Sequence, residues 1–109
     1  MTDDLETTCA ALKAPTIELM SATMLAQGNP GALVRVQAAV EGVRAVLASA
    51  PSTTSSPAFD AWAASAPAVL AEMEAGVESR DPRRAWQAFT DPVRGFDQLG
   101  QACAGMPGW

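Results

Sequence analysis

Apolar residues recur alternately three and four positions apart in four segments, and this spacing restricts the fold more than any other feature of the sequence. It is the spacing of helices with one apolar face, and no segment shows the period of two that is typical of a strand. The sequence therefore predicts an all-α fold with helices over about residues 4–27, 31–50, 57–79 and 82–104. Because helices joined by short links favour antiparallel neighbours, we expect one domain, residues 1–109, folded as an antiparallel up-down-up-down four-helix bundle.

Prolines mark both helix starts and helix bends. Ser56-Pro57 and Asp81-Pro82 each place an N-cap residue before a proline at the first helical position. Three further prolines fall inside predicted helices: Pro15, Pro67 and Pro92. Each lacks a backbone donor and crowds the carbonyl four residues earlier, so we expect proline-kinked helices. Since Asp91-Pro92 repeats the N-cap signal, the fourth helix can also be two pieces that meet near Thr90.

The two cysteines lie on apolar stripes at opposite ends of the chain. When antiparallel helices are aligned so that residues at one height form a layer, Cys9 and Cys103 fall in the same layer. This predicts a disulfide, which would stabilise the fold by about 4 to 5 kcal/mol through closure of a long loop. A disulfide implies an oxidising compartment and hence an exported, extracytoplasmic protein. The alternative is a cytoplasmic protein in which two separate thiols are buried as small apolar groups.

The same alignment places large side chains opposite small ones, as close packing requires. We expect Trp62 to pack over Gly100, and Trp86 to pack over Ala26 and Gly76.

The chain has no histidine, and this absence removes most catalytic and metal chemistry. Neither a Ser-His-Asp triad nor a histidine-ligated metal or haem is available, and two cysteines are too few for an all-cysteine zinc site. The sequence therefore predicts neither an enzyme nor a cofactor. A net charge of -5 with Lys13 as the single lysine argues against nucleic acid as a partner. Because no apolar run reaches the roughly 18 residues of a membrane span, we expect no membrane insertion.

The segment from Phe96 to Gly105 resembles the last helix of the cytochrome c′ bundles. That family attaches haem through a Cys-x-x-Cys-His motif. Cys103 matches the first cysteine, but Met106 and Pro107 stand where the second cysteine and the axial histidine belong. The sequence therefore excludes covalent haem of this type.

A small apolar pocket is predicted halfway along the bundle. The alignment places two glycines and a proline there at the height of Ile17: Gly42, Gly95 and Pro67. Because these residues have small side chains, we expect them to leave space between the helices. The residues expected to line the pocket are Ile17, Met20, Val43, Ala66, Val69, Val93 and Phe96. The alternative is that Phe96 fills the space and leaves no pocket.

Three arginines around the turn between the third and fourth predicted helices form the other candidate site: Arg80, Arg83 and Arg84. Their guanidinium groups could bind a carboxylate or phosphate. The alternative is a solvated turn in which they pair with Glu78 and Asp81.

These observations predict a non-catalytic helical binding or interaction module, exported, stabilised by a disulfide, and with an unidentified protein partner. The alternative is a carrier of a small apolar ligand held between the helices. Because Met1-Thr2-Asp3-Asp4 is acidic and polar, we expect a signal peptide to lie outside this chain.

Overall fold

Five α-helices and one 3₁₀ turn lie within residues 4–51 and 53–109, the part of the chain that the computed structural model describes. They are α1 (Asp4–Gly28), the 3₁₀ turn η1 (Pro30–Ala32), α2 (Leu33–Ser49), α3 (Pro57–Glu78), α4 (Pro82–Phe89) and α5 (Phe96–Ala102). No strand occurs within these residues, which confirms the all-α prediction.

The predicted proline starts of α3 and α4 are confirmed. The side chain of Ser56 accepts a hydrogen bond from the backbone N–H of Phe59 at 3.1 Å. Asp81 acts in the same way at the start of α4, accepting from the N–H of Arg84 at 3.2 Å. A proline follows each cap at a position whose N–H would have no helical partner, so each cap and proline together begin a helix.

The prediction of one continuous fourth helix is wrong, whereas the break expected near Thr90 is present. In the loop between α4 and α5, the Asp91 carboxylate accepts hydrogen bonds from the backbone N–H groups of Val93 and Arg94, both at 2.9 Å. The Gly95 N–H then donates to the Asp91 carbonyl at 2.8 Å. These bonds take the place of helical ones, and a proline between them has no N–H to offer, so α4 cannot continue into α5.

The same two bonds, from Arg94 first and Val93 second, hold the pKa of the Asp91 carboxyl below its ordinary value. A lowered folded-state pKa means that the ionised carboxylate stabilises the fold. This stabilisation is complete above the ordinary pKa and is lost as the pH falls through the lowered one. The α4–α5 loop is therefore an acid-sensitive part of the fold.

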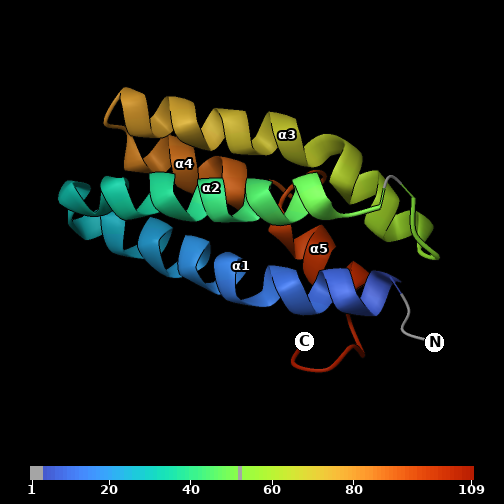
Figure 1. The fold of residues 1–109 in the computed structure, drawn as a ribbon. Helices are drawn as coiled ribbons and strands as arrows, with labels where there is room; N and C mark the ends of the chain where they lie inside the picture. The colour runs from blue at the N-terminus through green and yellow to red at the C-terminus, as the bar shows by residue number, and fades with distance from the viewer. Residues whose placement is uncertain (1–3, 52) are drawn as a thin grey trace.

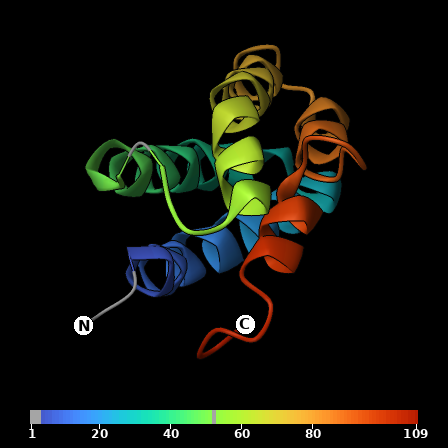
Figure 2. The same ribbon diagram turned by 90° about the vertical axis from the view of Figure 1, so that its right-hand side faces the viewer.

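The helices pack around a long core. Around the long axis α1 contacts α2, α2 contacts α3, α3 contacts α4, and α4 contacts α1, while α5 packs against α3 (Figure 1). Figure 2 shows α2 on one side of α3 and α4 on the other, with α1 across the base. Pro15 and Pro67 lie inside α1 and α3 without ending either helix, and Figure 1 shows that α3 bends along its length. The assembly measures 44 × 21 × 21 Å.

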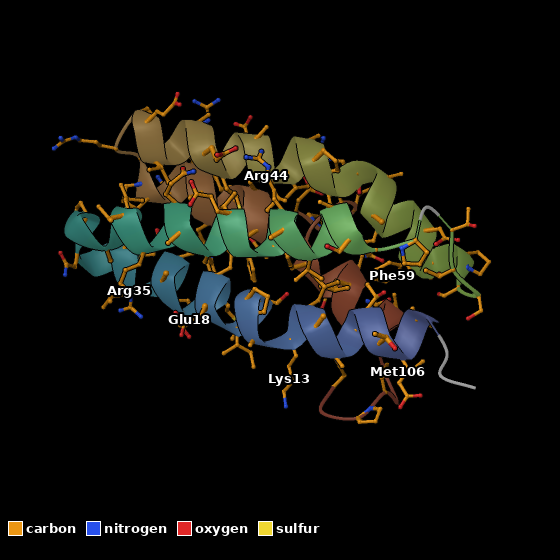
Figure 3. All side chains as sticks on the ribbon, viewed as in Figure 1. Lys13, Glu18, Arg35, Arg44, Phe59 and Met106 are labelled. Carbon is orange, nitrogen blue, oxygen red and sulfur yellow. A yellow bond between two sulfur atoms is a disulfide. The ribbon has the colours of Figure 1, made fainter. Side chains whose placement is uncertain are left out.

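Polar contacts tie α2 to its neighbours at the surface. Arg44 points from α2 toward α3 and forms an ion pair with Glu74, and Gln37 donates to the same carboxylate at 2.9 Å (Figure 3). The hydrogen bond from Gln37, and to a lesser degree Arg44, lowers the pKa of Glu74. Arg35 and Glu18 form a longer, exposed pair at 3.7 Å between α2 and α1.

The close approach expected at Gly76 occurs, but with a different neighbour. A Cβ at this position would lie 2.9 Å from the backbone nitrogen of Ala85 and 3.0 Å from the carbonyl oxygen of Asp81. The atoms nearest to such a Cβ therefore belong to the backbone at the start of α4 and not to Trp86. Trp86 is half-buried, and its ring stacks on Phe89.

Candidate functional site

The Cys9–Cys103 disulfide is present, which confirms the prediction. The two sulfur atoms are bonded, the Cα atoms are 5.8 Å apart, and both residues are fully buried. The C-terminal segment beyond α5 lies on the outer side of α1 (Figure 1). There the indole N–H of Trp109 donates to the carbonyl of Cys9 at 2.8 Å. The disulfide thus joins α1 to the residue that follows α5, 94 positions further along the chain.

Of the three predicted anion-binding arginines, Arg84 is already paired with a carboxylate. Arg84 donates to Glu72 on α3 at 2.6 Å, and this hydrogen bond lowers the pKa of Glu72 and raises that of Arg84. The partner is Glu72 rather than the expected Glu78 or Asp81. Arg80 and Arg83 are exposed and form no ion pair with any residue that the structure describes.

Arg80 does have an unusual backbone. Its φ is +54°, in the left-handed region, at the position after α3 where glycine is usual. The N–H of Asp81 donates to the carbonyl of Gly76 at 2.7 Å, and the N–H of Arg80 donates to the carbonyl of Val77 at 3.2 Å. These two bonds form a Schellman motif, which ends α3 and turns the chain into α4.

Replacing Arg80 by glycine is expected to raise the free energy of unfolding by about 0.5 to 1 kcal/mol. Glycine removes the left-handed penalty of about 1 to 2 kcal/mol, and its greater freedom in the unfolded chain returns part of that gain. Urea denaturation measures the change, with Arg83→Gly inside α4 as a control that should be destabilised instead. A less stable Arg80→Gly variant would show that the arginine side chain itself supports the turn.

The seven residues predicted to line an apolar pocket are divided among the core, the surface and a different cavity. Three are buried in the hydrophobic core: Val43, Ala66 and Val69. Ile17 is 46% exposed on α1, and Val93 is 78% exposed in the α4–α5 loop. The break after α4 removes Val93 from the helical stripe on which the prediction depended. Met20 and Phe96 remain, and both line a different cavity.

This cavity lies between α1, α4 and the start of α5, and we call it the α1/α4/α5 groove. Its volume is about 480 Å³. It is lined by Thr16 and Met20 of α1, Trp86 and Phe89 of α4, Thr90 and Pro92 of the loop, and Phe96, Asp97 and Gly100 of α5. The groove exists because the chain breaks between α4 and α5, so that two short helices meet α1 instead of one long helix.

Three aromatic rings give the groove an ordered apolar wall. Trp86 and Phe89 stack with centroids 5.9 Å apart, and Phe89 and Phe96 stack at 4.8 Å with an interplanar angle of 9°. Behind them Trp62 meets Phe96 edge-on at 5.4 Å and anchors the row in the core. Met20 comes from the opposite side on α1, and its flexible thioether can adapt to a neighbouring ring.

Gly100 leaves part of the groove empty. A Cβ on Gly100 would meet no atom within 4 Å, so the expectation that Trp62 packs over this glycine is wrong. Trp62 instead packs between Phe59, at 5.7 Å, and Phe96. A glycine inside a helix is less favourable than alanine by about 1 kcal/mol, and here no close neighbour requires it.

Few polar groups face this apolar surface. Thr16 has a buried hydroxyl oxygen without a hydrogen-bond partner, whereas the hydroxyl of Thr90 donates to the Trp86 carbonyl at 2.7 Å. Asp97 is exposed, and its carboxylate accepts from the side chain of Gln101 at 3.1 Å. Asp97 is the one titratable residue among those that line the groove, so the lining supplies no acid and base pair.

Sequence reasoning missed Thr16, Trp86, Phe89 and Gly100 as groove residues, and it expected Trp86 and Gly100 to be closely packed. The signal that could have found them is the Asp91-Pro92 pair, which ends α4 and opens this side of the fold.

Within residues 4–51 and 53–109, no group of three or more histidine, cysteine, aspartate or glutamate side chains is placed to hold a metal ion. The helices of the same residues include none that is long and apolar enough to cross a membrane. No protein-family model, curated protein or solved structure matches the chain.

Proposed function

We propose that this protein is a non-catalytic binding protein that carries a small apolar ligand in the α1/α4/α5 groove. The observation that supports the proposal best is the aromatic wall of Trp86, Phe89 and Phe96 beside the open space at Gly100. Small-molecule sites are usually clefts of about 300 to 1,000 Å³ with mainly apolar walls and a few polar groups. The groove, at about 480 Å³, has both properties.

A second recess of about 370 Å³, between α1 and α2, is a weaker candidate. Its walls are alanine, valine, serine and threonine side chains, with no aromatic residue. Each aromatic side chain buries a large apolar area on contact, so a recess without one offers a ligand less surface.

The scaffold of the proposed carrier is an antiparallel bundle in which α4 and α5 together take the place of a fourth helix. The contacts of α4 with α1 and α3, and of α5 with α3, support this description. The disulfide supports action in an oxidising compartment, and we propose that the protein is exported.

A protein partner is the second candidate ligand. Ile17, Met20 and Met24 are exposed and, being three and four positions apart, share one face of α1. Apolar side chains grouped on a surface helix are typical of protein contacts. Because Met20 also lines the groove, such a partner would contact the same region.

Filling the groove tests the proposal. A Gly100→Leu variant places a side chain in the open space and should weaken binding of phenylnaphthylamine, an uncharged fluorescent apolar probe, about tenfold or more. Probe fluorescence during titration measures the affinity. Gly28→Leu is the matched control, because Gly28 is also helical with open space around it but lies far along α1 from the groove residues.

The Gly28→Leu variant should bind the probe as the unmodified protein does, and circular dichroism should show that both variants keep their helices. A probe that fails to bind the unmodified protein, or that binds Gly100→Leu equally well, would contradict the proposed function.

A further inference from the structure

We infer that the ligand of the α1/α4/α5 groove is an uncharged aromatic molecule bearing an oxygen that hydrogen-bonds to the hydroxyl of Thr16. This inference rests on the proposed function and adds the chemical class of the ligand. It depends on three observations: the unpartnered hydroxyl, the charge at the groove and the shape of its wall.

The hydroxyl of Thr16 differs from those of Thr23 and Thr90. Thr23, two turns further along α1, is fully buried, and its hydroxyl donates to the Leu19 carbonyl at 2.5 Å. Thr90 makes the equivalent bond four residues back, to Trp86. This back-bond is the usual way for a helical threonine to satisfy its hydroxyl. Thr16 does not make it, and its oxygen is buried without any partner.

An unpartnered buried hydroxyl costs stability, so a group that pairs with it gains affinity. Thr16 as a residue is half-buried and lines the groove, while its oxygen has almost no exposed area. A rotation about the Cα–Cβ bond exchanges the hydroxyl with other parts of the side chain, and helical threonine populates two such rotamers. A ligand oxygen in the groove can therefore meet the Thr16 hydroxyl at little conformational cost.

The charge at the groove selects against anions. Asp97 is the one charged side chain of the lining, it is exposed, and no lysine or arginine is among the lining residues. The chain as a whole carries a net charge of -5. A carboxylate or sulfonate in the groove would be repelled by Asp97 without a compensating cation. This excludes fatty acids and other anionic amphiphiles as the preferred class.

The groove wall favours a flat ring system over a flexible chain. Phe89 and Phe96 are nearly parallel, and Trp86 is inclined to Phe89 by 16°, so the three rings form one stacked column. A planar aromatic ligand can pack against the edges of this column or stack on its end at Trp86, and it can also contact the thioether of Met20 from α1. A rigid ligand also loses less conformational entropy on binding than an alkyl chain does.

Three naphthalenes substituted at the same ring position test the inference by displacing bound phenylnaphthylamine. Acetylnaphthalene and ethylnaphthalene have nearly the same shape, but only the first carries an oxygen. We expect acetylnaphthalene to bind about tenfold more tightly than ethylnaphthalene, the effect of one hydrogen bond to an otherwise unpaired group. Naphthoate, which is anionic, should bind more weakly than acetylnaphthalene.

Thr16→Val removes the hydroxyl and keeps the shape of the side chain. In this variant the preference for acetylnaphthalene over ethylnaphthalene should vanish, while the melting temperature rises because the unpaired hydroxyl is gone. Thr90→Val is the matched control: it also alters a groove threonine, but one whose hydroxyl is already paired, so the tenfold preference should persist.

Equal binding of acetyl- and ethylnaphthalene by the unmodified protein would overturn the inference and leave the proposed function intact. So would a preference that survives in Thr16→Val, or tightest binding of naphthoate. Failure of all three naphthalenes and of the fluorescent probe to bind would instead contradict the proposed function.

Discussion

Replacing both Cys9 and Cys103 by alanine is expected to lower the free energy of unfolding by about 4 to 5 kcal/mol. The bond joins residues 94 positions apart, so it removes much of the freedom of the unfolded chain. Domains of this size are stable by only about 5 to 15 kcal/mol in total. The double variant should therefore be close to the limit of folding at physiological temperature.

Urea denaturation of the oxidised protein, the reduced protein and the double variant separates the two contributions of these cysteines. Reduction removes only the bond, whereas the alanine variant also removes two fully buried sulfur atoms from the core. Most of the loss should already occur on reduction. Equal midpoints for the oxidised and reduced forms, or two alkylatable thiols in unreduced protein, would show that the bond does not stabilise the fold.

The loss should be greatest at the C-terminal end of the chain. A helix as short as α5, which spans Phe96–Ala102, is not stable by itself, so its position depends on tertiary contacts. These contacts are its buried residues Phe96 and Leu99, the disulfide immediately after it, and the hydrogen bond from Trp109 to Cys9. Because α5 also forms one wall of the groove, reduction should weaken probe binding under conditions in which α1 to α3 remain helical.

The disulfide could be predicted because the two cysteines lie on apolar stripes near opposite ends of the chain, and an even number of antiparallel passes brings those ends together. The prediction held although Cys103 follows the break between α4 and α5. The helix starts could be predicted from local signals, since an N-cap and a proline act within one turn. The N-caps at Ser56 and Asp81 could therefore be predicted without knowledge of the rest of the fold.

The groove could not be predicted from the same spacing because a break in a helix changes which side of it faces the core. The apolar residues from Trp86 to Cys103 have the spacing of one helical face. The loop at Asp91 interrupts the helix, however, so the residues after it no longer continue that face. Val93 consequently lies at the surface, and Gly100 faces open space instead of Trp62. Only three-dimensional contacts show how far α5 turns relative to α4.

Gly95, where this turn is completed, should be the least replaceable glycine of the chain. Its φ of -77° is open to any residue, so backbone freedom is not the reason for a glycine. The reason is space. A Cβ would lie 2.6 Å from the carbonyl oxygen of Phe89 and 2.7 Å from the nitrogen of Asp91, and would collide with the carbonyl oxygen of Asp91 as well. All three are backbone atoms, which cannot move aside as a flexible side chain can.

Replacing Gly95 by alanine is therefore expected to lower the free energy of unfolding by about 3 kcal/mol, the upper part of the range for overpacked sites. Gly100→Ala is the matched control inside α5, the helix whose N-cap is Gly95: its Cβ meets no atom, so helix propensity should raise stability by about 0.5 to 1 kcal/mol. Urea midpoints of the two variants should thus move in opposite directions. A Gly95→Ala variant as stable as the unmodified protein would mean that α5 can detach from the end of α4 at little cost, and the groove between them would then have no fixed wall.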